Sequence, residues 1–381
     1  MILSFKNFFA FSLCLLALTS LSACQSDRRT AKKLDKDTSA TEIEGSLVFN
    51  NVTLDQFDEK GHPLWRVKAE KATYINDKKT ALIEKPTGDL FQDGKLVVQV
   101  SADSGEVQED GKTILLKGKI TATDTRNGTV FKGDELEWYP QDDLLVVRNN
   151  LKGIHPEQIE ASAKEGRYIT RKQQVDLKGS VTALSKNPNL QMKTEHLVWQ
   201  IKEQKLIGDQ RSRMERYKDK TVIERVEADQ SEYNLKTKVA ILKQNAQFTS
   251  VDPPVLISTN SAIWNLNTET VLSDQPVKIF HQKENVVLTA NQGQVDLEKN
   301  VANLTGGVQG VGSRNQAELY ANQMRWEIPT QNIQASGNVI YKQIDPPFNV
   351  TGATAVGKLQ DQSIVVSSGA SGDRVVTEFI P

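Results

Sequence analysis

The chain has 381 residues, enough for one large β domain or two ordinary domains, and 38% of them are hydrophobic against 25% charged. Its 47 basic and 48 acidic side chains nearly cancel, so it lacks the basic excess of a duplex-binding protein and we expect no nucleic-acid partner. Cys14 and Cys24 are the only cysteines, which leaves no disulfide for the folded part.

The first 24 residues have the layout of a secretory signal segment, with Lys6 followed by an apolar run and small residues. Leu21-Ser22-Ala23-Cys24 is similar to a bacterial lipoprotein box, which predicts cleavage before Cys24 and a lipid anchor on its thiol. The alternative is an uncleaved membrane helix, although the 16 residues of 8–23 fall short of the roughly 20 that span hydrocarbon. Both interpretations place the rest of the chain outside the cytoplasm, tied to a membrane.

Residues 25–45 show no apolar periodicity and mix cations such as Arg28 and Lys32 with Asp27 and Asp35. This composition is typical of a flexible, solvated tether. The alternative is a basic patch that lies near anionic lipid.

From Ser46 onward, apolar residues recur with a period of two. In "KTILLKGKITA", for example, Ile114, Leu116, Gly118 and Ile120 fall on one face. Short polar turns such as "TRNG", "YPQDD" and "DLEKN" separate the runs and suit antiparallel hairpins. No stretch of this part has the pattern of a long amphipathic helix, so we expect an all-β protein.

Tryptophan residues, with tyrosine or valine halfway between them, recur at a regular spacing along this part of the chain. Successive members are 30 or 31 residues apart, except for one step of 34 between Trp199 and Tyr233. The members are Val107, Trp138, Tyr168, Trp199, Tyr233, Trp264, Val295, Trp326 and Val356. Such a period predicts about ten stacked hairpins between residue 46 and about residue 370, followed by a tail over 371–381. The longer step, near "GDQRSRMERYKDK" at 208–220, predicts an exposed loop and a joint at 209–220 if the structure divides into two tandem halves.

Stacked hairpins bury their apolar faces if the long sheet folds over on itself. The sequence therefore predicts an elongated antiparallel β-jellyroll whose apolar lining takes acyl chains if its long side gapes. Apolar residues at alternating strand positions are also typical of an ordinary core, so each of them has this second interpretation. The candidate lining residues are Leu136, Trp138, Leu197, Trp199, Trp264 and Trp326, and on the intervening strands Ile120, Tyr168, Val181 and Tyr233.

The stretch from "LVFNNVTLDQFDEKGHPLWRVKAEKATYINDKKTALIEKPTGDLFQDGKLVVQVSADSGEV" to "LKGKITATDTRNGTVFKGDELEW" resembles the LptC family of lipopolysaccharide export, and the A-x-x-x-x-Y/V units resemble the OstA-type repeats of LptA. The resemblance implies a periplasmic β-jellyroll that is anchored in the inner membrane. By this resemblance, the jellyroll would receive lipopolysaccharide from an inner-membrane ABC extractor and pass the acyl chains along a hydrophobic groove. The resemblance also implies docking through open sheet edges. The first strand, near 47–57, would face the transporter, and the last, near 363–367, an LptA-like bridge protein. The chain departs from the familiar form because it carries far more repeats.

Enzymatic signals are weak. His62, His155, His196 and His281 are scattered without metal-ligand spacing, and no nucleophile elbow, phosphate loop or dinucleotide fingerprint appears. We therefore expect no enzyme, no metal and no cofactor. The alternatives are a parallel β-helix, as in polysaccharide-acting proteins and adhesins, and an envelope scaffold with a closed, filled core.

Overall fold

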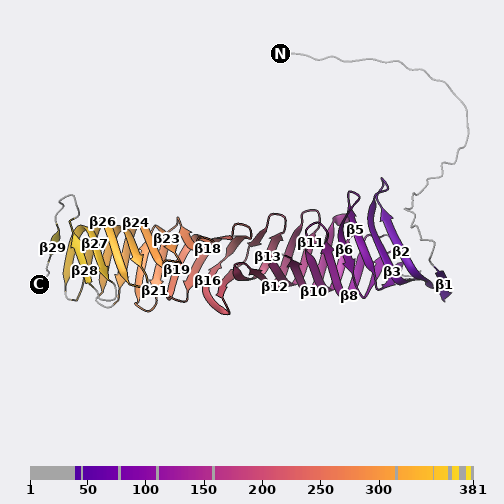
Figure 1. Ribbon diagram of the computed structural model, residues 1–381, viewed down its shortest axis with the longest axis horizontal. Helices are drawn as coiled ribbons and strands as arrows, with labels where there is room; N and C mark the ends of the chain where they lie inside the picture. The colour runs from indigo at the N-terminus through magenta and orange to yellow at the C-terminus, as the bar shows by residue number, and fades with distance from the viewer. Residues whose placement is uncertain are drawn as a thin grey trace, which may run out of the picture.

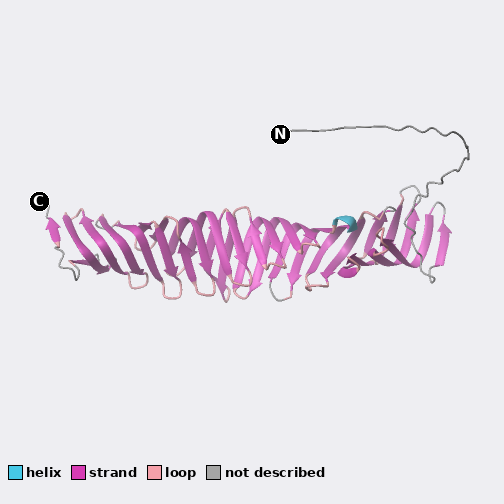
Figure 2. Cartoon of the chain, turned by 90° about the horizontal axis from the view of Figure 1, so that it is seen from above, coloured by secondary structure: helices cyan, strands magenta, loops and turns pink. Residues whose placement is uncertain are grey.

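In the computed structural model the chain forms one elongated β-sheet that is folded along its length (Figures 1 and 2). The structure describes residues 39–43, 46–75, 79–108, 111–156, 159–313, 316–345, 347–358, 363–368 and 375–378. Every strand pairing in these ranges is antiparallel, which confirms the all-β antiparallel jellyroll and excludes the parallel β-helix. The predicted signal segment and Cys24 lie outside the described residues.

The sheet has 29 strands in the described part of the chain. Fourteen of them are long and continuous: β2 Ser46–Phe57, β3 Pro63–Ile75, β8 Ile114–Asp124, β9 Val130–Tyr139, β10 Leu144–His155, β11 Ile159–Ile169, β12 Gln174–Lys186, β13 Asn189–Gln200, β18 Val239–Ser250, β19 Val255–Asn265, β24 Val301–Gly312, β25 Ala317–Glu327, β26 Asn332–Gln343 and β27 Phe348–Lys358. The others are shorter: β1 Ser39–Ile43, β4 Thr80–Glu84, β5 Thr87–Gln92, β6 Lys95–Ser101, β7 Ser104–Gln108, β14 Lys205–Gly208, β15 Ser212–Lys218, β16 Thr221–Ala228, β17 Gln230–Asn234, β20 Thr270–Ser273, β21 Val277–His281, β22 Val286–Ala290, β23 Gln292–Asp296, β28 Ser363–Ser367 and β29 Val376–Glu378. A 3-10 turn, Pro140–Asp142, follows β9.

A line of left-handed residues bends the sheet along its middle, and we call this line the crease. Six long strands carry two successive residues there with φ between 45° and 87°, and the pairing register shifts at each pair. The pairs are Gly118–Lys119, Asn149–Asn150, Gly179–Ser180, Gln244–Asn245, Gly306–Gly307 and Gly337–Asn338. Glycine and asparagine suit this conformation because they tolerate positive φ. Gly118, expected on the inner face, instead forms the crease at φ 78°.

The crease divides the sheet into two walls that pack against each other. The Trp wall contains the strand halves that hold Trp138, Trp199, Trp264 and Trp326, and the facing wall contains the other halves. In β10, for example, residues 144–148 belong to the Trp wall and residues 151–155 to the facing wall. One continuous cluster of buried apolar side chains fills the space between the walls.

The region 208–220 was expected to be an exposed loop, and this prediction is wrong. Most of it forms β14 and β15, where Met214 is fully buried. The extra residues of the 34-residue step lie in the β15–β16 hairpin, whose tip at 217–223 extends beyond the last pairs with β13 and β18. Strand pairing runs unbroken through this region. The division into two tandem halves stays a prediction.

Both ends of the folded part extend further than the sequence indicated. Within the predicted tether, Ser39–Ile43 forms β1 and pairs with Ser46–Asn50 of β2. Within the predicted tail, Val376–Glu378 forms β29 and pairs with Asn349–Thr351 of β27. These short segments pair through their backbones, which requires no apolar pattern and therefore leaves little signal in the sequence.

Candidate functional site: the interior and the seam

One row of inward side chains follows the length of the Trp wall, and we call it the inner row. Its 17 members are directly opposite one another on successive strands, and each is at most 6% exposed. They are Ala81, Val107, Ile114, Trp138, Leu145, Tyr168, Val175, Trp199, Leu206, Tyr233, Ala240, Trp264, Val271, Val295, Ala302, Trp326 and Ile333. At about 4.8 Å between strands, the row is roughly 75 Å long.

All ten candidate lining residues lie inside the folded sheet, each at most 2% exposed. Six of them are on the inner row, whereas Leu136 and Leu197 are one step nearer the crease on the same wall. Ile120 and Val181 are on the facing wall, just beyond the crease. Val356, the last member of the sequence period, is 57% exposed and opposite Gln334, so it does not belong to the inner row.

The tryptophans cross the interior to the facing wall. Trp138 and Trp199 lie over glycines: a Cβ on Gly88 would be 3.0 Å from Cζ3 of Trp138, and a Cβ on Gly153 would be 3.3 Å from Cζ3 of Trp199. Farther along, the ring of Trp264 makes an edge contact with Phe248. The opposite walls are therefore in contact through the side chains expected to line a trough.

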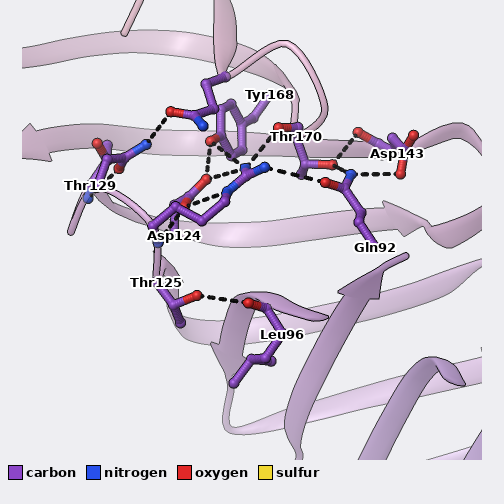
Figure 3. Close-up of polar contacts among 11 residues, drawn as sticks. Gln92, Leu96, Asp124, Thr125, Thr129, Asp143, Tyr168 and Thr170 are labelled. Atoms are coloured by element: carbon purple, nitrogen blue, oxygen red, sulfur yellow. Dashed lines mark hydrogen bonds and ion pairs between the residues drawn. The ribbon is translucent and has the colours of Figure 1, made fainter. Parts of the chain in front are cut away.

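Polar residues close the long side opposite the crease, where the turns of the two walls meet, and we call this side the seam. Near the N-terminal end, Nε2 of Gln92 donates to Oδ1 of Asp143 at 2.7 Å and to Oγ1 of Thr170 at 2.6 Å (Figure 3). The guanidinium of Arg126 donates to the carbonyl of Thr170 at 2.7 Å and pairs with the fully buried Asp124. These contacts hold the seam shut here.

The same closure recurs along the seam. Lys238 Nζ donates to Oδ1 of Asn187 at 3.2 Å. In the longer hairpin, Arg216 donates to Glu269 at 2.8 Å across the seam and pairs with Glu224 on its own wall. Each of these two contacts joins residues about 50 positions apart in the sequence, one from each wall.

Two cavities that are lined by described residues interrupt the seam. The first, of about 550 Å³, lies near the N-terminal end between Asp58, His62 and Arg171. The second, of about 210 Å³, lies beside the longer hairpin. Its lining combines the charged Arg216 and Glu224 with the apolar residues Phe248, Val255, Ile257, Val295, Leu297 and Ile328.

Burial and charge pairing shift several pKa values at the seam. Burial raises the pKa of Glu224, against the opposing hydrogen bonds from Arg216. Burial and the neighbouring Asp124 raise the pKa of Tyr168, whose hydroxyl donates to that carboxylate. Burial lowers the pKa of His281, which is 3% exposed beside Trp326. Tyr168 and His281 therefore stay neutral at neutral pH.

The polar seam was missed at the sequence level because its residues are in turns that read as ordinary solvated loops. A usable signal exists in "TRNG" and "TRKQQ", which contain Arg126, Asn127, Thr170 and Gln173. Asn127 Nδ2 donates to Oε1 of Gln173 at 2.9 Å, so the two turns contact directly. To pair these two turns from the sequence, one must know how far the strands of the facing wall are shifted relative to those of the Trp wall. The period alone does not give this shift.

No metal site is found in the described ranges, where no three His, Cys, Asp or Glu side chains gather with suitable geometry. Among the described residues, no helix has the length and the apolar content that a membrane span needs.

Comparison with known proteins gives one family. The model of the family described as lipopolysaccharide-assembly, LptC-related, matches residues 12–143, 127–252 and 213–313. Among solved structures, the chain is similar to LptH of Pseudomonas aeruginosa, described as the LptA homologous periplasmic component of the lipopolysaccharide transport device. That match has 13% identity and a TM-score of 0.27, and covers 30% of this chain and 82% of LptH. No curated protein matches the chain.

Proposed function

Because the chain belongs to the LptC-related family of lipopolysaccharide assembly, we propose that it is a periplasmic carrier of lipopolysaccharide, tethered to the inner membrane through its N-terminus. It receives the lipid from an ABC extractor and passes the acyl chains along the inner row while the sugars stay in water. Cys24 is the proposed lipid anchor. The carrier catalyses no reaction.

The observation that carries the proposal is the unbroken inner row. It gives hydrocarbon an apolar surface over roughly 75 Å without a charged member. Burial of hydrocarbon contributes about 0.8 kcal/mol per methylene relative to water, so several acyl chains are held without specific chemistry. Acyl chains that leave a bilayer are already out of water, however, so their transfer along the inner row has little driving force of its own. Directional force must come from the ATP-driven partner.

Lipid entry requires the seam to open, because side chains fill the interior of the closed form. Each hydrogen bond across the seam contributes only about 0.5–1.5 kcal/mol net, since water replaces the partner when it opens. The apolar contacts between the walls are replaced by contacts with acyl chains. A seam of separate polar contacts thus opens locally beside a passing lipid while the crease keeps the walls joined.

The sheet edges are the proposed docking surfaces. At the N-terminal end β1 pairs with Ser46–Asn50, so the stretch proposed to meet the transporter is Val52–Asp55 of β2. At the C-terminal end β28, Ser363–Ser367, pairs with Thr354–Lys358 of β27 and is proposed to meet an LptA-like bridge protein. Addition of a strand to such an edge supplies backbone hydrogen bonds and fixes the register.

Site-specific photo-crosslinking tests the transport proposal. A photoreactive residue at Trp199 or Trp264 should capture lipopolysaccharide in membranes supplied with ATP, and capture should fall when ATP is withheld. The matched controls are Lys117 and Lys119, whose side chains are exposed on the outside of the same fold. Equal capture from the controls would contradict the assignment of the lining.

An envelope scaffold with a filled core is the second candidate, and the complete burial of all four inner-row tryptophans favours it. The same experiment separates the two functions. A scaffold whose seam never opens gives no crosslink from Trp199 or Trp264, with or without ATP.

A further inference from the structure

Four indole N–H groups in the interior have no hydrogen-bond acceptor among the described residues. They belong to Trp138, Trp199, Trp264 and Trp326, whose side chains are fully buried. The hydroxyl of Tyr233, midway between Trp199 and Trp264 in the inner row, has no partner either. Buried polar groups in proteins are nearly always hydrogen-bonded, so a repeated exception calls for an explanation.

Other aromatic residues of the same interior are satisfied, so the pattern is not a general property of this fold. Trp65 lies on the facing wall, off the inner row, and its Nε1 donates to Oε1 of Gln56 at 2.6 Å. The hydroxyl of Tyr168, on the inner row, is bonded to Asp124. Unused donors are therefore concentrated on the inner row, on the surface proposed to carry lipid.

The donors form a regular ladder along the inner row. Successive tryptophans are four strands apart, which corresponds to roughly 19 Å. Their inner-row neighbours are apolar: Trp199, for example, is directly opposite Val175 and Leu206. The ladder therefore offers neutral donors in an apolar setting, which suits neutral acceptors and disfavours a charged phosphate, whose burial needs a paired cation.

We propose that these indole N–H groups donate to the carbonyl oxygens of ester- or amide-linked acyl chains as the lipid moves along the inner row. The inference rests on the proposed function and adds the recognition chemistry to it. Where each acyl chain joins its headgroup, a carbonyl oxygen lies next to hydrocarbon, and the ladder matches this combination of an acceptor with an apolar chain. Successive donors let the lipid exchange one hydrogen bond for an equivalent one.

The test replaces the indole by an isostere that lacks the N–H. Trp199→3-benzothienylalanine keeps the bicyclic shape and puts sulfur in place of the donor, and the same change at Trp65 is the matched control. In the full-length protein without lipid, Tm should rise at position 199, because an unsatisfied buried donor is removed. At position 65 Tm should fall, because the bond to Gln56 is lost.

Ligand binding is measured as retention of radiolabelled ligands by the immobilised full-length protein. We expect the variant at 199 to bind lipopolysaccharide about two- to tenfold more weakly, the factor for one lost neutral hydrogen bond. A dodecanoyl ester of a disaccharide should show the same loss, whereas the dodecyl ether of that disaccharide, without a carbonyl, should bind both proteins equally.

The outcomes separate the two proposals. If the unmodified protein retains no lipopolysaccharide, the proposed function fails. If it retains lipopolysaccharide and the variant at 199 does so equally, the donor ladder is overturned while the carrier function stands. An unchanged Tm at 199 would mean that ordered water satisfies the indole, which also overturns the ladder, as would an equal loss for the ester and the ether.

Discussion

The two adjacent glycines of the β24 crease provide a matched pair for testing what folds the sheet. Gly306 and Gly307 have φ values of 83° and 87°, so alanine at either position incurs a similar backbone cost of about 1–2 kcal/mol. Their surroundings differ. An added Cβ at Gly306 would be 2.9 Å from Cβ of Asn291, whereas at Gly307 it would have nothing within 4 Å. Gly306→Ala should therefore destabilise the protein more than Gly307→Ala.

The size of this difference follows from the contact with Asn291 alone, because the backbone and unfolded-state effects of the two changes cancel. Overpacking against an atom fixed to the backbone typically costs about 1–3 kcal/mol, and we expect a difference of this size in the free energy of unfolding. Urea denaturation followed by tryptophan fluorescence measures it, and hydrogen exchange of the 301–312 segment shows whether the loss is local. Gly307→Asn should be nearly neutral, since asparagine occupies the same second position of the crease pair at Asn150 and Asn338. Equal effects of the two alanine changes would refute the claim that the contact with Asn291 makes Gly306 the more sensitive position of the crease.

Three further predictions concern the seam, the outer face and the docking edge. Arg126→Gln leaves the buried carboxylate of Asp124 without its ion pair, so urea denaturation should show that the free energy of unfolding falls by about 1–3 kcal/mol. The loss is smaller than for a fully buried pair because Arg126 is partly exposed. An unchanged urea midpoint would contradict this prediction. Burial opposes a charged His196, but hydrogen bonds to carboxylates, including that of Asp209, raise its pKa. The stabilising effect of these bonds should therefore be complete below pH 6.5 and lost as pH rises through the folded-state pKa. His196→Gln should remove this pH dependence of the urea midpoint. Val365→Pro in β28 should reduce crosslinking to the bridge protein while hydrogen exchange of β26 stays unchanged, and loss of protection in β26 would show a folding defect instead.

The sequence predicted the architecture well because strand alternation and a regular spacing are local signals. Trp138 and Trp199 are on the inner row because one unit contains two strands and the turns between them vary little in length. The left-handed conformation of Gly118 was missed, since a glycine in an alternating pattern fits the inner face as well as a corner. Val356 was misassigned because exposed and buried valines look alike at the end of a sheet.

The seam and the donor ladder depend on relations across the fold that no local pattern contains. Arg126 and Thr170 meet only because the facing strands are offset, and that offset arises from how the walls stack. The indole of Trp65 donates to Gln56, whereas the indole of Trp199 has no acceptor within the described ranges. The composition of their strands does not predict this difference. The sequence contains the 34-residue step, but only the strand pairing places its extra residues in the hairpin that holds Arg216.

The crease also allows the length of the folded sheet to vary with the number of units. Each pair of left-handed residues bends its own strand, and each unit of about 31 residues adds two strands, or roughly 10 Å, to the long axis. Duplication or deletion of a unit would change the length while leaving the bend of every other unit as it was, because each left-handed pair lies within a single strand. The number of units therefore sets the length of the folded sheet.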